Sequence, residues 1–413
     1  MSRSKYILLL ALLVLTLVPV AVEAQTPPQP VLISAGPVIE GTGTAVISDD
    51  QSLRDSIMIA MTGVTPPAEG TAYEGWLVSD DGETKMSTGI MTVAIDGSIS
   101  HTFGSASEGY TGDNLIAGFS TFVITVEPVP DTDSMPSDTV AFGHSVPLEG
   151  MAHIRHLASD WPVDSGTGIM TDLKAQLDIA IQHAELAASS ETIEDVKSHM
   201  QHVINTIEGE DGANFDAAAT NPGDGIGIIA HAQDAKHGPF AATAVPDDEV
   251  IGAHALLVEA SGANVEAWAS EARDIALNKV IGESSFALAK IFVGPGGGTV
   301  ISTLMAARNG FDGNGDGTVS GAAGEGGADQ AYVESQLMAT FTLEPGPPVP
   351  QTPPTPTPEP TPIGGPQPTA PGLPGVGDDS VPIAAQLALL AAVVLLGTGG
   401  IFMARGRRSR KSI

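Results

Sequence analysis

The chain has 413 residues, no cysteine, and a formal charge of −32 from 17 basic and 49 acidic side chains. Its length allows two or three domains, and the absence of cysteine excludes disulfides and the C-x-x-C-H motif of c-type haem proteins. The acidic surface repels nucleic acid, which is therefore not expected as a partner, and it attracts cations. The same charge is also typical of adaptation to solubility or salt.

The first 24 residues are predicted to be a secretory signal peptide. Arg3 and Lys5 precede an apolar run over residues 6–20, and Val22-Glu23-Ala24 supplies a small-residue cleavage site. We therefore expect the mature chain to begin near Gln25 and to be exported.

Residues 31–147 are predicted to form a β-sandwich. Short β-branched runs alternate with turn signals, and Asp96-Gly97 between two such runs is typical of a hairpin. About seven strands at this spacing favour two packed sheets. The predicted strands cover 44–47, 56–61, 73–78, 89–95, 98–103 and 119–126.

Three segments of this region resemble the extracytoplasmic domain of anti-sigma-K factors. They are residues 70–78 (GTAYEGWLV), 96–98 (DGS) and 122–128 (FVITVEP), in the order found in that family. The resemblance implies a β fold located outside the membrane. In that family a sigma-binding domain lies in the cytoplasm ahead of the membrane helix, whereas here the β region follows a predicted signal peptide. Sigma-factor binding is therefore not expected.

Residues 148–343 change to helical periodicity and are predicted to form an antiparallel helical bundle. Apolar residues recur at helical spacing over 170–184 and 193–207, and the 221–225 segment (NPGDG) is predicted to be a loop. A further helical pattern covers 247–292, with a break expected near Ser261-Gly262.

Eight of the ten histidines lie between residues 151 and 257, and an H-x-x-H pattern occurs twice there. Two histidines three residues apart lie on one face of a helix, one turn apart, so both imidazoles can approach one target. Both pairs lie beside the apolar stripe of their helices, on its polar flanks. The candidate ligands of a shared transition-metal site are His153, His156, His183, His199 and His202.

Neutral imidazole binds zinc, copper and iron, and Asp195 or Glu185 can add a carboxylate ligand or orient an imidazole. Two alternatives stay open. A histidine pair can hold b-type haem in an electron-transfer or redox protein. The histidines can also be solvated or locally hydrogen-bonded side chains of a purely structural surface or adhesion protein. HxxH differs from the HExxH pattern of metalloproteases, so an enzyme is not the favoured interpretation.

A second candidate site resembles an EF-hand calcium loop between two predicted helices, 299–308 and 328–341. Oxygen ligands at loop positions 1, 3 and 5 and glycine at position 6 match the calcium pattern. Position 12 is Ala323 instead of an acid, and Glu325 lies two residues later. The predicted calcium ligands are Asp312, Asn314, Asp316, Thr318, Ser320 and Glu325.

The C-terminal part is predicted to be a stalk and a membrane anchor. Residues 345–380 are rich in proline and threonine and are expected to be extended, and residues 381–404 form an apolar run long enough to span a bilayer. The basic tail 405–413 is expected in the cytoplasm. The segment 373–377 (LPGVG) resembles an LPxTG cell-wall sorting signal, but Val376 replaces the threonine. Plain membrane anchoring is therefore the preferred interpretation over cell-wall attachment.

Together these features predict a single-pass bacterial surface protein with its domains outside the cell. The favoured function is non-enzymatic binding of a transition metal at the histidines and calcium at the acidic loop. A protein or cell-wall partner is expected but not identified by any motif. The predicted fold is therefore multidomain, an all-β sandwich followed by an all-α bundle.

Overall fold

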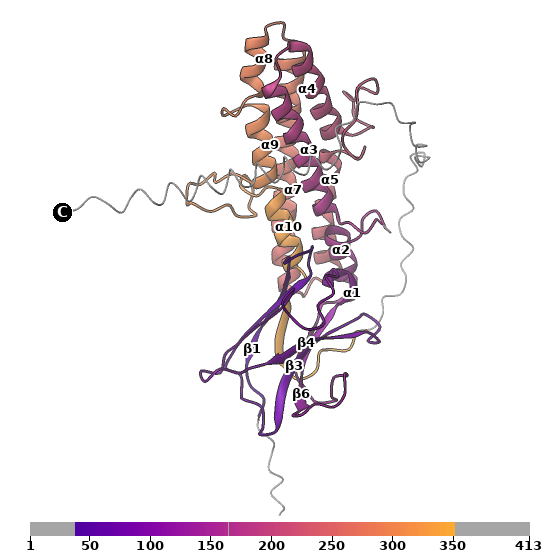
Figure 1. Ribbon diagram of the computed structural model, residues 1–413, viewed down its shortest axis with the longest axis vertical. Helices are drawn as coiled ribbons and strands as arrows, with labels where there is room; N and C mark the ends of the chain where they lie inside the picture. The colour runs from indigo at the N-terminus through magenta and orange to yellow at the C-terminus, as the bar shows by residue number, and fades with distance from the viewer. Residues whose placement is uncertain (1–37, 164, 352–413) are drawn as a thin grey trace, which may run out of the picture. The chain divides into compact units, whose positions relative to one another are not determined.

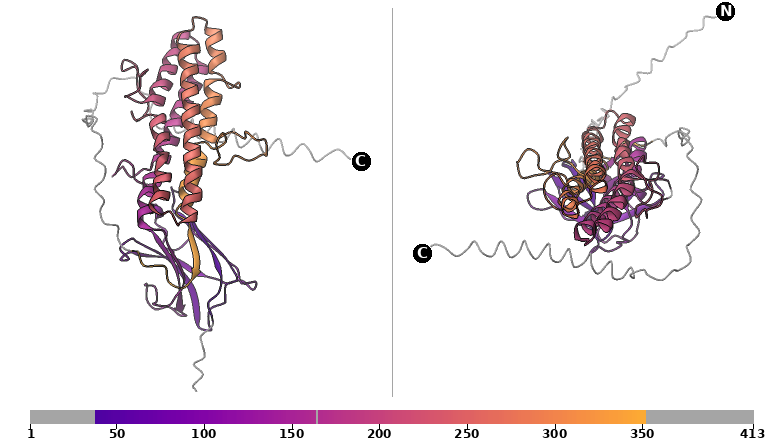
Figure 2. Two further views of the ribbon diagram at one scale, coloured as in Figure 1. Left: turned by 180° about the vertical axis from the view of Figure 1, so that it is seen from behind. Right: turned by 90° about the horizontal axis from the view of Figure 1, so that it is seen from above.

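The strand-rich and helical regions form two adjoining halves in a computed structural model, which describes residues 38–163 and 165–351 (Figures 1 and 2). The helices extend from one end of the sheet. The predicted signal peptide, most of the linker, the 381–404 apolar run and the basic tail lie outside the described residues. Within them, no helix is both long and apolar enough to cross a bilayer.

Eight antiparallel strands form one sheet in the order β4-β3-β6-β7-β8-β1-β2-β5. Alternate residues point inward, as expected for a sheet with one buried face. In β2, for example, Ile57, Ile59 and Met61 are buried, whereas Met58 is exposed. The strands are β1 (Thr42–Ser48), β2 (Ser56–Thr62), β3 (Thr71–Val78), β4 (Lys85–Met91), β5 (Ile99–Phe103), β6 (Thr121–Pro128), β7 (Val140–Ser145) and β8 (Phe341–Pro345).

The sheet curls into a near-closed barrel whose seam lies between β4 and β5. These strands are consecutive in the chain yet occupy the two ends of the strand order. His101 of β5 bridges the seam, with its Nε2 2.7 Å from the carbonyl oxygen of Thr88 in β4. A single curled sheet therefore stands where the sequence pattern suggested a two-sheet sandwich.

The Asp96-Gly97 turn forms as predicted, but the strands beside it do not make a regular hairpin. Gly97 has a φ of 78°, and its amide donates to the carbonyl of Ala94. β4 instead pairs with β3, and β5 pairs with β2. Local turn chemistry was readable from the sequence, whereas the choice of strand partner depended on closure of the barrel.

Strand β8 joins the barrel from a position almost 200 residues after β7. It pairs with β1 through Phe341–Leu343 and with β7 through Glu344 and Pro345. Phe341 and Leu343 are fully buried. The helices are therefore inserted between two neighbouring strands of the barrel, an arrangement that local sequence patterns did not predict.

The helical half is built on three longer helices, α3, α4 and α7, against which the shorter helices pack. Their buried faces follow the predicted stripes, including Met170, Leu173 and Leu177. The helices are α2 (Leu148–Ala158), α3 (Ile169–Ser189), α4 (Ile193–Glu208), α5 (Ile228–Gln233), α6 (His237–Ala244), α7 (Glu249–Ile275), α8 (Phe286–Val293), α9 (Val300–Asn309) and α10 (Ala328–Leu337). A short α1 (Leu115–Gly118) lies within the barrel half, the 3₁₀ turn η1 (Asp234–Lys236) precedes α6, and the π-helical segment η2 (Ala276–Ile281) continues α7.

Helix α7 is not interrupted at Ser261-Gly262, where a break was expected. A Cβ at Gly262 would lie 2.4 Å from the Cβ of Ala235 and 2.8 Å from the carbonyl oxygen of Ala232. Glycine is therefore present because α7 passes very close to the α5–η1 segment, and the helix tolerates it in exchange for this close packing.

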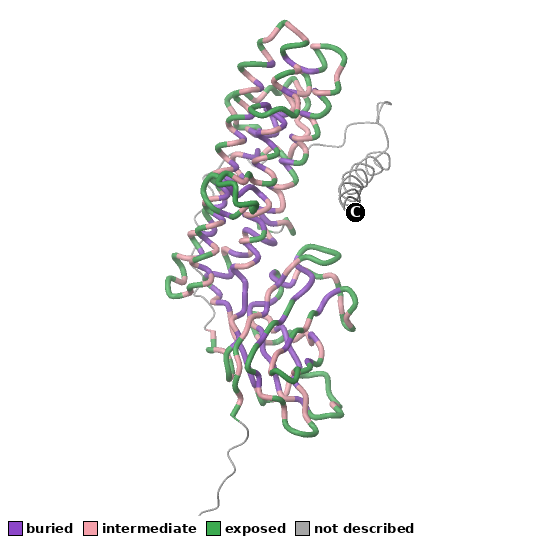
Figure 3. Tube along the Cα trace, turned by 90° about the vertical axis from the view of Figure 1, so that its left-hand side faces the viewer, coloured by how far each residue is buried: buried purple, intermediate pink, exposed green. Residues whose placement is uncertain are grey.

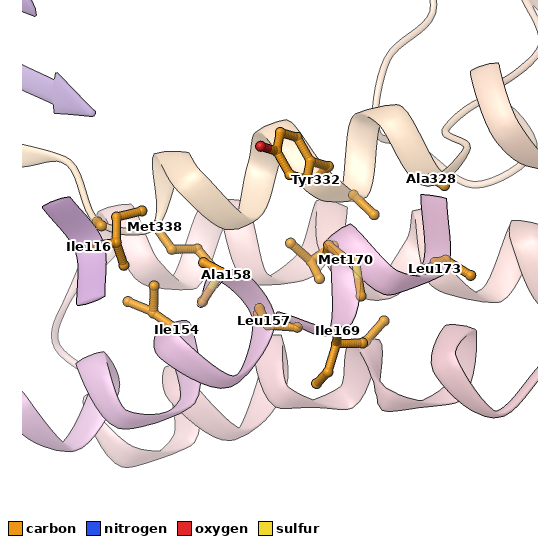
Figure 4. Packing of buried hydrophobic residues seen from close by; sticks show 14 of the residues in the cluster. Ile116, Ile154, Leu157, Ala158, Ile169, Met170, Leu173, Ala328, Tyr332 and Met338 are labelled. Carbon is orange, nitrogen blue, oxygen red and sulfur yellow. The ribbon is translucent and has the colours of Figure 1, made fainter. Parts of the chain in front are cut away.

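The two halves share one hydrophobic core (Figures 3 and 4). Buried positions continue from the barrel into the helices. At the junction, Ile116 of α1 and Met338 after α10 lie near Ile154 of α2, while Leu157 lies near Ile169 of α3. Burying such side chains stabilises the fold by about 1.5–3 kcal/mol each, so the junction is a structural interface and not a flexible link.

Polar groups also join the barrel to the helices. Asp49 accepts hydrogen bonds from the Tyr332 hydroxyl at 2.6 Å and from Gln336 Nε2 at 2.7 Å. The buried Arg54 donates to Thr171 Oγ1 at 3.0 Å and lies over the Tyr332 ring. These contacts hold α10 and α3, the helix that carries His183, against the end of the barrel.

Candidate metal centres

Three histidines from α2 and α6 converge in a first cluster, called triad 1: His153, His156 and His237. The Nδ1 atom of His237 lies 3.2 Å from Nδ1 of His153 and 3.2 Å from Nδ1 of His156. One ligand atom from each imidazole lies within 4.8 Å of the others. Triad 1 is therefore a three-nitrogen cluster with a common centre.

Local structure explains how triad 1 forms. Ile154 and Leu157 face the core of the molecule, so His153 and His156 lie along the neighbouring face of α2. His237 is the first residue of α6, which packs against α2. The one-turn spacing of the pair and the start of α6 together direct three rings at one point.

Three other histidines, from α3 and α4, form triad 2: His183, His199 and His202. The Nδ1 atom of His183 lies 3.3 Å from Nδ1 of His199 and 3.2 Å from Nδ1 of His202. These ligand atoms also lie within 4.8 Å of one another. The five predicted ligands are thus divided between two clusters instead of surrounding one ion.

The α3–α4 hairpin explains how triad 2 forms. Only three residues separate α3 from α4, and Thr192 caps α4 by accepting a hydrogen bond from the Asp195 amide. Val196, Met200 and Val203 are buried against neighbouring helices. The histidines occupy the flank of this stripe, as predicted, and meet His183 across the hairpin.

The two triads have nearly the same geometry. The rings of the HxxH pair are 5.9 Å apart at an interplanar angle of 82° in triad 1, and 5.7 Å apart at 83° in triad 2. From the third histidine, the two ring distances are 5.4 and 4.8 Å in triad 1, and 5.5 and 4.8 Å in triad 2. Two unrelated helix pairings therefore produce one ligand arrangement.

The nitrogen spacing fits a bound transition metal. A zinc–imidazole bond is about 2.0–2.1 Å long, so tetrahedral coordination separates two ligand nitrogens by about 3.4 Å. Hydrogen bonding accounts for the spacing less well, because a single Nδ1 carries either one N–H or one in-plane lone pair and faces two partners in each triad. Three imidazoles leave one tetrahedral position for water or another ligand.

Burial keeps the central imidazoles neutral. Desolvation, followed by repulsion from the two neighbouring histidines, lowers the pKa of His183 and that of His237 to about 4. Desolvation also lowers the pKa of His153 and of His202. Metals bind the neutral imidazole, so the ligands need not release protons at neutral pH.

His237 was missed in the sequence analysis although it was counted among the eight clustered histidines. No local pattern pairs it with His153 and His156, because it lies about eighty residues further along the chain. The doubled HxxH motif was the only signal that could have found it, because two separate three-histidine sites would need one more histidine than His183 supplies.

No carboxylate joins either triad among the described residues. Asp195, which was predicted to assist the site, instead accepts a hydrogen bond from the Thr192 hydroxyl at 2.7 Å, at the start of α4. Two histidines outside the triads do pair with acids. His231 Nε2 lies 2.7 Å from Asp224, and His254 Nδ1 lies 2.5 Å from Glu334.

The predicted calcium loop lies between α9 and α10 and folds around its own side chains. Asp312 accepts hydrogen bonds from the amides of Gly315 and Gly317, while Glu325 is buried and accepts one from Ser320 Oγ at 2.6 Å. Asn314 and Asp316 accept the amides of residues 316 and 318. The described part of the chain does not bring three carboxylate or imidazole ligands together in this loop, so calcium binding stays a prediction.

The triads differ from the arrangement required for b-type haem. The two axial ligands of a haem iron lie on opposite faces of the macrocycle, whereas each triad brings three nitrogens to one side of a common centre. Nitrogens only 3.2–3.3 Å apart leave no room for a ring between them. Neither triad therefore has the ligand arrangement of a b-type haem held by a histidine pair.

Comparison with known proteins covers the barrel strands β1 to β6 but not the triads. Residues 6–140 match the model of the family described as anti-sigma-K factor rskA, C-terminal. This match agrees with the resemblance seen in the three barrel segments. Searches of curated proteins and of solved structures found no significant match. The helices that carry all six triad histidines lie beyond the matched segment.

Proposed function

We propose that this chain is an extracytoplasmic metal-binding protein that holds one transition-metal ion in each histidine triad. The observation that carries the proposal is the repetition of one three-nitrogen geometry in two places, with ring distances that agree within 0.2 Å. Histidines that merely share solvent have no reason to repeat an arrangement so closely.

The donor set favours zinc or copper. Imidazole nitrogen suits zinc, copper, nickel and iron, whereas calcium and magnesium require oxygen ligands. Both triads are entirely nitrogen-based. The acidic composition of the chain adds a general attraction for cations, which raises their local concentration near the protein.

The proposed location outside the cell depends on the predicted signal peptide, the predicted C-terminal anchor and the match of the barrel to a family domain. In this proposal the barrel supports the helices, and the proline-rich segment separates both from the membrane. The triads then meet metal ions of the external medium or of the cell envelope.

Metal analysis of the purified protein tests the proposal. The chain is purified without tags or chelators, its metal content is measured, and the chelated protein is then titrated with zinc or with copper. We expect two ions per chain, with one lost in His183→Ala, one in His237→Ala and both in the double variant. Binding of fewer than one ion per chain, or binding that both variants leave unchanged, would contradict the proposal.

The acidic loop is the second part of the proposed function. Calcium is expected to engage Asp312, Asn314 and Asp316 together with Glu325, replacing the internal hydrogen bonds of the loop. Isothermal titration with calcium, repeated with Asp316→Asn, measures this directly. No heat of binding in the millimolar range would show that the loop is only a glycine-rich connection between α9 and α10.

A further inference from the structure

The two triads share their ligand geometry but differ in the side chains packed against them. The Trp161 ring lies 4.6 Å from His156 and 4.9 Å from His237, centroid to centroid. Phe240 lies 5.7 Å from His153 and 5.5 Å from His237. Every imidazole of triad 1 therefore contacts at least one aromatic ring.

Triad 2 has no such aromatic surround in the described part of the chain. Its ring contacts are those among His183, His199 and His202 themselves. His237 of triad 1 is only 6% exposed, whereas His153, His156 and all three histidines of triad 2 are half-buried. The difference in surround therefore comes from His237 and from the rings of Trp161 and of Phe240, which is itself 44% exposed, and it makes triad 1 the more apolar of the two sites.

This difference in surround matters because the cost of desolvating an ion depends on its charge. All three ligands are neutral imidazoles, so no ligand offsets the charge of the metal. The cost of moving an ion from water into a low-dielectric site rises with the square of its charge, so a divalent ion pays about four times the cost of a monovalent ion of the same size. An apolar surround therefore penalises divalent ions more than monovalent ones.

Nearby charged groups do not reverse this preference at His237. Asp234 and Lys236 both act on this imidazole, but with opposite signs. They also form an ion pair with each other at 2.7 Å. Aromatic faces, in contrast, attract any cation by about 0.5–2 kcal/mol. This attraction offsets a larger fraction of the desolvation cost of a monovalent ion than of a divalent ion, because the cost for the monovalent ion is smaller.

We propose that triad 1 selects copper(I), whereas triad 2, with the same ligands, prefers divalent zinc or copper(II). Copper(I) is the monovalent transition-metal ion that imidazole ligands can hold. The inference rests on the proposed metal-binding function and adds a division of labour between its two sites. Trp161 and Phe240 are the residues that determine the difference.

The test uses variants that retain a single triad. His183→Ala leaves triad 1, and His237→Ala leaves triad 2. For each variant, the affinity for copper(I) is measured without oxygen against a chromophoric competitor, and the affinity for zinc(II) is measured in the same way. The ratio of the two affinities is expected to be at least tenfold higher in triad 1 than in triad 2.

The aromatic residues are then removed in the triad 1 variant. Trp161→Leu with Phe240→Leu keeps apolar volume but removes the rings, and Trp161→Ala with Phe240→Ala removes both ring and volume. The alanine pair is expected to bring the ratio down to the triad 2 value, with the leucine pair in between. Trp268→Leu, at a half-buried tryptophan on α7, is the matched control and should leave the ratio unchanged.

Each other outcome overturns the inference in a recognisable way. Equal ratios in the two triads, or a ratio that the aromatic substitutions leave unchanged, would show that the surround does not select the ion. A ratio that changes in Asp234→Asn but not in the aromatic variants would assign selection to charge. Failure of both triads to bind any ion would instead contradict the proposed function, and circular dichroism of each variant separates that result from unfolding.

Discussion

Triad 1 and triad 2 are the same ligand arrangement built from different parts of the chain. In triad 2 the third histidine precedes the HxxH pair and comes from the adjacent helix of a hairpin. In triad 1 it follows the pair by about eighty residues and begins a short helix. The two triads therefore share the positions of their three nitrogens, although the helices that supply the histidines are connected differently.

The largest effect is expected when a single histidine is replaced, because this removes the ion from one triad and leaves the other triad occupied. His183→Ala or His237→Ala removes the imidazole whose Nδ1 faces both of its partners, so the affected triad keeps only two ligands. At metal concentrations about 100-fold above Kd, each occupied site stabilises the folded protein by about 2.7 kcal/mol. Urea unfolding with and without metal should therefore show half of the metal-induced stabilisation in each single variant.

Equal loss of both ions in either single variant would contradict the separation of the triads. Such a result would mean that the two clusters act as one cooperative unit. The double variant is the reference, because it should show no stabilisation by zinc or copper at all.

The next effect concerns pH and the metal-free protein. The folded protein holds the pKa of His183 and of His237 at about 4, whereas an unfolded histidine has a pKa of about 6.5. As the pH falls from 6.5 towards 4, the unfolded chain takes up protons that the folded chain does not, so stability decreases. Above this window both states are neutral at these positions and the effect disappears.

Denaturant unfolding of the chelated protein at pH 7 and pH 5 measures this effect. The wild type should lose more stability between the two values than the variant with both His183→Ala and His237→Ala. An equal loss in both proteins would show that the two imidazoles are already protonated in the folded state near pH 6.

A smaller effect is expected from the contacts that hold α2, which carries two histidines of triad 1, against the barrel. Arg155 lies between the two histidines of α2, and its guanidinium pairs with Asp80 through two contacts of 2.7 and 2.8 Å. It also donates to the carbonyl of Ile116. Partly exposed ion pairs contribute up to about 1 kcal/mol, so Arg155→Met should weaken binding at triad 1 by up to about fivefold.

Triad 2 provides the internal control, because its affinity should not change in Arg155→Met. Asp80→Asn should have a similar effect at triad 1, and the double variant should be no worse than the single ones if the pair acts as a unit. Additive losses would show that Arg155 acts through its other contacts instead.

The smallest effect is expected at Asp195. This residue contacts Thr192 in the first turn of α4, where a carboxylate stabilises a helix by about 0.3–1 kcal/mol. Asp195→Asn should therefore reduce stability slightly and leave two ions bound. Loss of the triad 2 ion in this variant would restore the earlier hypothesis that Asp195 assists the metal site.

Local patterns predicted much of this molecule. The alternation in β2, the Asp96-Gly97 turn, the stripe of α3 and the polar-flank position of His199 and His202 all agree with the structure. Each depends on residues within one or two turns or strands. The predictions about export, anchoring and calcium stay predictions, because they concern residues or ligands outside what the structure describes.

The sequence alone predicted a β region followed by a helical region. It also identified five of the six triad histidines and the chemistry of an imidazole ligand. Only the tertiary structure decided that β8 completes the barrel, that His237 joins His153 and His156, and that the histidines form two clusters. Periodicity specifies which face of an element is buried, but not which distant element covers that face. That choice depends on packing of the whole core, and here it determined the number of metal sites.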